Sequence, residues 1–332
     1  MPRLGRKHMR KLAGAGAALL LALAGGFAVA QSGYPDKPIR ILVGFSPGTG
    51  PDVTARLFAD KWNDSWTKGL TVENITGAGG NLAVAQLLKV APDGATLAMG
   101  GNAALVINPN LMDKLGYDPL KDFTYISQVF IVPNLVVVPP HVPAKDIQEL
   151  IALAKAKPDY FVAGHAGIGT SQHLGAELFK YMAKVDIASV PYRGTTALMP
   201  DLLAGRLTMS FANVVNVLPL AREGKLRALA ITSIKRSALA PDLATMAETG
   251  FPGFEAVPWF GLMAPAGTPK DVLDKLHAET VKTLAMAEVR KKFDELGLEP
   301  VGNTPAEFAA VMKKEMPEWA KVIKDAGIKL GN

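Results

Sequence analysis

The sequence predicts an α/β protein of two lobes, each a mostly parallel β-sheet flanked by helices, with two crossovers of the chain between the lobes. The first supporting observation is that strand-like apolar runs alternate with helix-like segments along most of the chain. This alternation is typical of parallel sheets with helices on both faces. The second is that two apolar runs, at 134–138 and 254–264, break the alternation. The third is that three glycine-rich turns each join a strand to a helix.

The elements follow from hydrophobic periodicity, with short apolar runs assigned as strands and amphipathic segments as helices. Before residue 100 we expect strand 39–45, helix 52–66, strand 70–73, helix 81–90 and strand 95–99. A second series begins with helix 144–156, strand 160–163, helix 171–183 and strand 187–190. It continues with helix 197–204, strand 207–211, helix 214–223 and strand 226–231.

The tail from residue 256 is helix-rich, and a helix start is expected at Thr268-Pro269. The simplest topology returns this tail to the first lobe. We therefore expect residues 35–135 plus 256–332 to form lobe 1 and residues 136–255 to form lobe 2. The two crossings of the chain would then act as a hinge.

Residues 1–30 read as a cleavable Sec-type signal peptide. Five basic residues precede an apolar stretch, and Ala28-Val29-Ala30 gives an A-x-A cleavage pattern before Gln31, so cleavage is expected after Ala30. A permanent membrane anchor is the alternative interpretation. No later stretch approaches the ~20 apolar residues of a membrane span. The mature chain is expected to be soluble and periplasmic, without stable insertion in the membrane.

Charge and cysteine content exclude several classes of function. The chain has 36 Lys and Arg against 30 Asp and Glu. Removing the five basic residues of the signal peptide leaves 31 against 30, so the basic pI gives no reason to expect a nucleic acid partner. The absence of cysteine excludes disulfides, thiolate nucleophiles and cysteine-based metal sites.

The three glycine turns are the candidate functional elements. They span residues 46–52, 76–81 and 164–171, hereafter the first, second and third turns. Turns of this kind lie at the carboxyl ends of strands, where open α/β sheets bind ligands, and the helix that follows offers free backbone N–H groups to an anion. Neither G-x-G-x-x-G nor G-K-[ST] occurs in these turns, so no nucleotide cofactor is expected.

Ser46 matches the G-x-S-x-G pattern of a hydrolase nucleophile, but the next residue argues against that role. In a nucleophile elbow the residue after the serine donates its backbone N–H to the oxyanion. Here that residue is Pro47, which has no N–H. The histidines lack paired metal-binding spacing. We therefore expect no catalytic residue, no metal and no cofactor.

Several blocks, taken in order, resemble one known family along the whole mature chain. They are F-S-P-G-T-G-P-D, the G-A-G-G-N turn, Y-D-P-L-K-D-F, G-x-G-T-S-Q-H-L-G-A-E-L-F, V-P-Y-R-G, D-L-L-A-G-R-L and W-F-G-L-M-A-P-A-G-T-P. The sequence is similar to the periplasmic receptors of tripartite tricarboxylate transporters, also called Bug receptors. The resemblance implies a type II-like, two-lobed periplasmic binding protein that closes on a small carboxylate and presents it to a membrane permease.

The resemblance also implies which residues form the site. The ligand-binding residues carried over are Phe45, Ser46, Pro47, Gly48, Thr49, Gly79, Gly80, Asn81, His165, Thr170, Ser171, Arg193, Asn213 and Trp259. The alternative for Arg193 is that it is a solvent-exposed turn residue that does not bind the ligand. Asp52 is expected to cap its own turn and helix start, because a carboxylate there would repel an anionic ligand.

Departures from the family pattern bear on specificity. His165 stands where a small serine is common, and Ala212 where an aspartate is common. These changes favour an aromatic or medium-chain carboxylate over an amino acid, with dicarboxylates left open. We expect a monomer. The alternatives left open are a secreted serine hydrolase and a ligand-sensing module for a membrane signalling partner.

Overall fold

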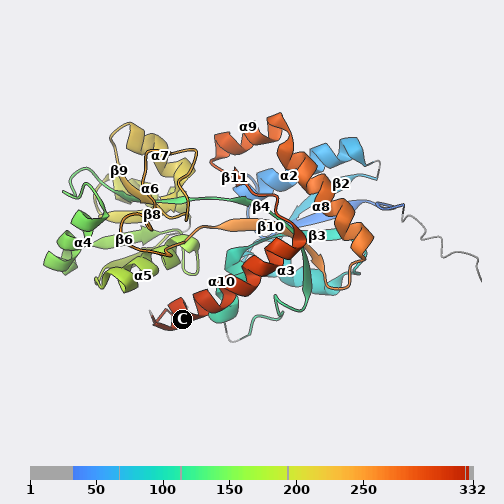
Figure 1. The fold of residues 1–332 in the computed structure, drawn as a ribbon, viewed down its shortest axis with the longest axis horizontal. Helices are drawn as coiled ribbons and strands as arrows, with labels where there is room; N and C mark the ends of the chain where they lie inside the picture. The colour runs from blue at the N-terminus through green and yellow to red at the C-terminus, as the bar shows by residue number, and fades with distance from the viewer. Residues whose placement is uncertain (1–32, 67, 113, 193, 326, 329–332) are drawn as a thin grey trace, which may run out of the picture. The chain divides into compact units, whose positions relative to one another are not determined.

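Two β-sheets, called A and B below, organise the chain in this computed structural model (Figure 1). The structure describes residues 33–66, 68–112, 114–192, 194–325 and 327–328. From Tyr34 onward the described chain forms one compact unit. The predicted signal peptide, residues 1–30, lies outside the described residues. Within the described part of the chain, no helix combines the length and apolar character needed to cross a membrane.

Sheet A and its helices form lobe 1. The strand order is β11-β4-β10-β3-β1-β2, and β1 pairs in parallel with both β2 and β3. The strands are β1 (Ile39–Val43), β2 (Leu70–Asn74), β3 (Thr96–Gly101), β4 (Phe123–Ile131), β10 (Trp259–Pro265) and β11 (Glu299–Pro300). Successive side chains of β1 enter different cores, Ile41 packing in one and Leu42 in the other. Both faces of the sheet are therefore covered, as expected from the unbroken apolar run.

Sheet B and its helices form lobe 2. The strand order is β7-β6-β8-β5-β9. The strands are β5 (Asn134–Val138), β6 (Val162–His165), β7 (Ala188–Pro191), β8 (Met209–Asn213) and β9 (Arg227–Ile231). Alternate residues of β5 again face different cores, with Leu135 and Val137 in one and Val136 and Val138 in the other. This strand is buried on both faces.

Helices cover both sheets and connect most of the strands. In lobe 1 they are α2 (Gly50–Ser65), α3 (Asn81–Gln86), α8 (Lys270–Ala285), α9 (Ala287–Leu296) and α10 (Pro305–Asp325). In lobe 2 they are α4 (Ile147–Ala156), α5 (Ser171–Ala183), α6 (Thr195–Leu203) and α7 (Val214–Arg222). Shorter helical turns are η1 (Ala78–Gly80), η2 (Leu87–Lys89), η3 (Ala103–Ile107), η4 (Asn108–Asn110) and η5 (Pro158–Tyr160).

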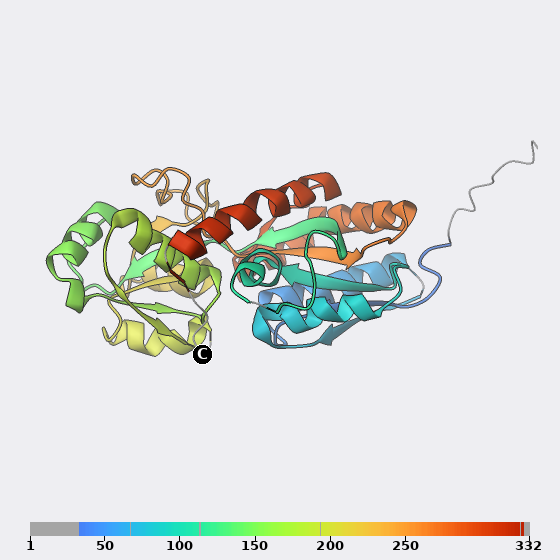
Figure 2. The same ribbon diagram turned by 90° about the horizontal axis from the view of Figure 1, so that it is seen from below.

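The chain crosses between the sheets at two adjacent places. The first crossover joins β4 to β5, and the second leads into β10. The N–H of Val132 in the first donates to the carbonyl of Pro258 in the second at 2.8 Å, so the two segments lie side by side. Helix α10 runs from lobe 1 towards lobe 2 (Figure 2), where the Tyr181 hydroxyl on α5 donates to Asp325 at 3.3 Å.

The two-lobed α/β fold with two crossovers is confirmed, and one feature of the prediction is corrected. The sheets are mixed rather than mostly parallel, because β5 and β10 run antiparallel to both of their neighbours. Each of these strands enters its sheet directly from a crossover, without the helix that would turn the chain back for parallel pairing. They are the two runs that interrupted the alternation in the sequence.

Other differences concern the elements themselves. Strand β4 and the π-helical turn η3 were not predicted. The single helix expected at 81–90 is instead α3 followed by η2. The helix predicted at 171–183 is confirmed as α5.

Candidate functional site

The three glycine turns lie close together at the carboxyl ends of their strands. A Cβ atom built on Gly44, just before the first turn, would overlap the Cα atom of Gly80 in the second. Asn108 connects the second turn to the third. Its Nδ2 lies 3.1 Å from where a Cβ of Gly79 would stand, and its Oδ1 lies 3.2 Å from the same point on Gly169. The second turn, from sheet A, and the third turn, from sheet B, are therefore separated only by the side chain of Asn108.

Asp52 holds the first turn in place. Its side chain is 2% exposed and accepts from the N–H of Gly48 at 2.8 Å, from Asn74 at 2.8 Å and from Arg56. Burial opposes ionisation of this carboxyl, but these hydrogen bonds outweigh it, and the pKa of Asp52 lies below its ordinary value. The carboxylate thus uses one of the amides that the sequence had suggested for a ligand.

The outer part of the first turn is open to solvent. Ser46, Pro47 and Gly48 are exposed, and the Thr49 hydroxyl donates to the carbonyl of Ser46 at 2.7 Å. Phe45 is half-buried, and its ring packs edge-on against Phe260 with centroids 5.3 Å apart. The first turn therefore has an accessible backbone next to a packed aromatic side chain.

The second turn is supported by a buried amide network. Asn81 is 5% exposed. Its Oδ1 accepts from Asn108 Nδ2 at 2.9 Å and from the Tyr117 hydroxyl at 3.1 Å, and its Nδ2 donates to the sulfur of Met112. The Asn81 side chain is thus engaged inside lobe 1. What the second turn can offer a ligand is the exposed backbone around Gly79, because glycine leaves the main chain uncovered; Gly80 is buried.

The third turn is closed by the first residues of α5. The Thr170 hydroxyl donates to the carbonyl of Gly167 at 2.6 Å and accepts from the N–H of His173 at 3.3 Å, which caps the helix. The Ser171 hydroxyl is buried and accepts from Asn134 Nδ2 at 3.3 Å. Both hydroxyls therefore position the turn.

Two imidazoles, tilted by 32° to each other, contact the backbone of the third turn. His165 and His173 have ring centroids 4.4 Å apart, and His165 is 1% exposed. His165 Nδ1 lies 3.0 Å from the carbonyl oxygen of Gly167, and His173 Nδ1 accepts from the N–H of Gly169 at 3.3 Å. Burial, and next the neighbouring His173, lowers the pKa of His165 to about 4. Burial also lowers the pKa of His173, so both rings are neutral at pH 7.

The second wall of the site begins at Asn213, at the end of β8. Its Oδ1 accepts from Gln172 Nε2 at 2.7 Å, and the same nitrogen donates to Thr195 Oγ1 at 2.8 Å. Gln172 is 4% exposed and was not among the predicted site residues. In the sequence, the only indication of a role for Gln172 is that a polar residue stands in the first turn of a helix expected to be buried. Arg193 lies outside the described residues.

Trp259 does not point its side chain towards the turns. The residue is 3% exposed, its indole N–H donates to Glu315 on α10 at 2.8 Å, and its ring packs edge-on against Phe308. Burial raises the pKa of Glu315 to about 7. Trp259 therefore anchors α10 beside the second crossover, and the structure does not bring its side chain together with the other predicted residues.

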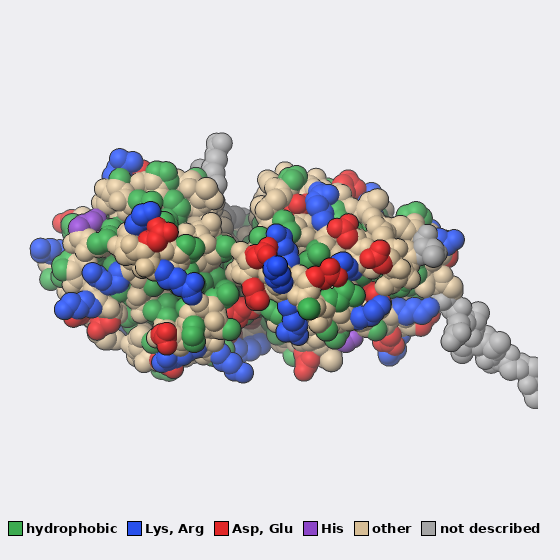
Figure 3. Space-filling model, turned by 90° about the horizontal axis from the view of Figure 1, so that it is seen from above, with side chains coloured by type: hydrophobic (Ala, Val, Ile, Leu, Met, Phe, Trp, Pro, Cys, Tyr) green, Lys and Arg blue, Asp and Glu red, His purple; other side chains and the backbone are tan. Residues whose placement is uncertain are grey.

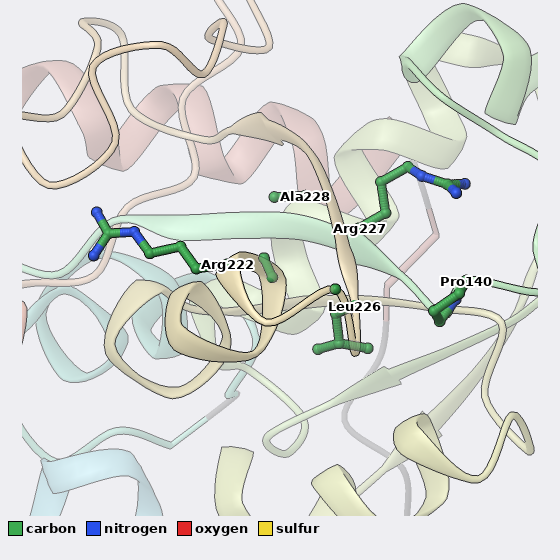
Figure 4. A pocket seen from close by; sticks show the side chains of 7 residues that line it. Pro140, Arg222, Leu226, Arg227 and Ala228 are labelled. Carbon is green, nitrogen blue, oxygen red and sulfur yellow. The ribbon is translucent and has the colours of Figure 1, made fainter.

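Acidic and basic side chains are interspersed over the face shown in Figure 3. A surface depression on lobe 2 is lined partly by Arg222 and Arg227, but their guanidinium groups point away from each other (Figure 4). It contains none of the predicted site residues. Among the described residues, no group of three or more acidic or histidine side chains could hold a metal ion.

Comparisons with known proteins give a consistent result. The sequence model of the family described as "Tripartite tricarboxylate transporter family receptor" matches residues 54–328. The protein BugT of Bordetella pertussis (strain Tohama I) is 36% identical over 303 residues, covering 91% of this chain and 93% of BugT.

Two solved structures are similar to this chain in sequence and fold. One is R. palustris Rpa4515 with adipate, at 33% identity and a TM-score of 0.78, covering 89% of this chain and 99% of that one. The other is MatC from Rhodopseudomonas palustris with bound malate, at 32% identity and a TM-score of 0.74, covering 87% and 100%.

Proposed function

Because this chain belongs to the family of tripartite tricarboxylate transporter receptors, we propose that it captures a small carboxylate between its two lobes and delivers it to a membrane permease. The observation that carries the proposal is that the second turn meets the third at Asn108, while Gly44, just before the first turn, lies against Gly80 of the second. Glycine backbone and helix starts from both sheets therefore lie near one another. Such groups bind an anion without any cationic side chain.

Capture works by a shift of population between open and closed forms. A ligand favours the closed form only if both lobes touch it there. The first and second turns belong to lobe 1, and the third turn and Asn213 belong to lobe 2. A carboxylate held by all of them stabilises closure. The adjacent crossovers at Val132 and Pro258 are the proposed hinge.

The protein is proposed to act in the periplasm as a monomer, after export through residues 1–30 and cleavage after Ala30. The permease then recognises the closed form. Uptake of a labelled carboxylate by cells that lack the receptor gene tests this step, because restoring the gene should restore uptake. Signalling without uptake would contradict delivery.

The ligand leaves chemically unchanged in this proposal. The Ser171 hydroxyl is paired with Asn134, and the Nδ1 atoms of His165 and His173 are paired with glycine backbone. These partners do not form the serine–imidazole hydrogen bond that a hydrolase uses to activate its nucleophile. Pro47 also denies an oxyanion its backbone donor.

The ligand is proposed to be a dicarboxylate or an aromatic carboxylate. Related structures with adipate and malate support the first class. The half-buried ring of Phe45 supports the second, because it can pack against an apolar ring. Aspartate and glutamate carry an ammonium group for which the described turns place no free carboxylate, since Asp52 is occupied.

Calorimetry on residues 31–332 tests the proposal, with adipate, malate, benzoate, nicotinate, aspartate and glutamate as titrants. We expect at least one of the first four to bind with micromolar affinity, about 8 kcal/mol of binding free energy. Aspartate and glutamate should bind at least about a hundredfold more weakly, roughly 2.7 kcal/mol. NMR of the recovered ligand should show the starting compound. Binding of none of the six, or conversion of one, would refute the proposal.

A further inference from the structure

Gln172 connects the starts of three helices in lobe 2. It lies in the first turn of α5, Thr195 begins α6, and Asn213 immediately precedes α7. One nitrogen, Nε2, donates to Thr195 Oγ1 at 2.8 Å and to Asn213 Oδ1 at 2.7 Å. Because an amide nitrogen has two hydrogens, these two bonds use its whole donor capacity.

The direction of these hydrogen bonds is determined by what surrounds Gln172. Its Oε1 is buried and accepts no hydrogen bond from the described residues. Reversing the amide would place Oε1 between Thr195 and Asn213, and both N–H groups would then be buried where Oε1 now lies. Buried N–H groups without acceptors are rarer in proteins than under-used carbonyl oxygens. The arrangement with Nε2 towards Thr195 and Asn213 is therefore favoured.

This direction determines what the second wall can offer a ligand. With Oδ1 of Asn213 accepting from Gln172, the Nδ2 group of Asn213 is directed away from Gln172 as a donor. With Oγ1 of Thr195 accepting from the same nitrogen, its hydroxyl hydrogen is also left to donate. Asn213 is only half-buried and stands at the carboxyl end of β8. The wall therefore presents the Nδ2 donor of Asn213, with the hydroxyl of Thr195, a residue 7% exposed, beside it.

We propose that Gln172 is a specificity-determining residue, which orients Asn213 and Thr195 so that the second wall donates hydrogen bonds to a second acceptor group on the ligand. The second group is then a carboxylate or carbonyl, remote from the carboxylate held at the glycine turns. This inference rests on the proposed function and narrows it to ligands with two acceptor ends. Gln172 acts through its neighbours, so its role is positioning.

Calorimetry with adipate and hexanoate tests this inference, because the two differ in having a carboxylate or a methyl group at the remote end. The wild-type protein should bind adipate about tenfold more tightly than hexanoate or better. In Gln172→Met, which keeps the size of the side chain without its donors, Asn213 is free to turn. Adipate affinity should fall about tenfold while hexanoate affinity changes less than about threefold. The exposed Gln148 on α4 supplies the control Gln148→Met, which should leave both affinities unchanged.

A second variant guards against a folding defect in the first. Asn213→Asp keeps the oxygen that Gln172 uses and replaces the proposed donor by an acceptor, so adipate should lose far more affinity than hexanoate. Equal losses for both ligands in both variants would overturn the inference, since Gln172 would then only pack. Equal wild-type affinities for both ligands would also overturn it while leaving carboxylate capture intact. Binding of neither probe nor any other carboxylate would refute the proposed function and this inference together.

Discussion

The first and third glycine turns are built alike in opposite lobes and differ in one side chain. In each, a threonine stands just before the helix, and its hydroxyl donates to the carbonyl three residues back, Thr49 to Ser46 and Thr170 to Gly167. In each, the third helical residue accepts the N–H of the glycine four residues back. That residue is Asp52 in the first turn and His173 in the third.

This difference in one side chain shows that the two turns share a backbone geometry but differ in charge. The same turn is held by a carboxylate in lobe 1 and by a neutral imidazole in lobe 2. The charge of Asp52 is balanced by Arg56 at 2.9 Å, and Asn74 donates a hydrogen bond to it. An incoming anion therefore meets a positive helix start with a carboxylate already beside it in the first turn, and a helix start without one in the third. For the proposed ligand, the third turn is the more favourable place for a negative charge.

The largest expected effect is on stability, and it concerns the first turn. Asp52→Ala removes the acceptor for Gly48 and Asn74 and takes from Arg56 its carboxylate partner, leaving it only the bond to Asn74 Oδ1. We expect a loss of about 3 kcal/mol in the free energy of unfolding, measured in urea. The exposed Asp60 on the same helix provides the control Asp60→Ala. Similar small losses in both variants would show that the carboxylate does not hold the turn.

The second effect is the pH dependence of stability, which should separate the two turns. The unfolded chain binds a proton on histidine near pH 6.5, whereas folded His165 does so only near pH 4. As pH falls below about 6.5, the unfolded state takes up this proton first, so stability is lost down to about pH 4. Asp52 behaves differently. Its pKa is lowered by folding, so its contribution is lost only below the ordinary carboxyl pKa, about pH 4.

Unfolding free energies of the wild type and His165→Asn between pH 8 and pH 5 check this difference. The wild type should lose about 2 kcal/mol more than the variant over this range. His141→Asn, at an exposed position in lobe 2, is the control and should follow the wild-type curve. Parallel curves for the wild type and His165→Asn would contradict the burial of a neutral imidazole in the third turn.

The sequence predicted the position of the turns better than the direction of their side chains. Strand, glycine turn and helix are local patterns, and α5 begins and ends where periodicity placed it. The direction of a side chain depends on partners far along the chain. Trp259 bonds to Glu315, 56 residues away, and Asn81 bonds to Asn108, 27 residues away. Asn108 follows the π-helical turn η3, which has no simple periodicity.

The smallest effect we expect tests whether contact between turns matters for binding. Gly44→Ala places a Cβ against the Cα of Gly80, and backbone cannot move aside as a flexible side chain can, so the first and second turns must separate. Gly50→Ala, six residues on, is the matched control, because its Cβ meets nothing closer than Leu298 at 3.4 Å. Binding sites require their groups to be held within about 0.5 Å of the productive geometry. In calorimetry with adipate, Gly44→Ala should therefore weaken binding about tenfold and Gly50→Ala by less than about twofold. Equal affinities in the two variants would mean that the third turn holds the ligand largely by itself. The first and third turns would then differ in binding by more than the carboxylate of Asp52 explains.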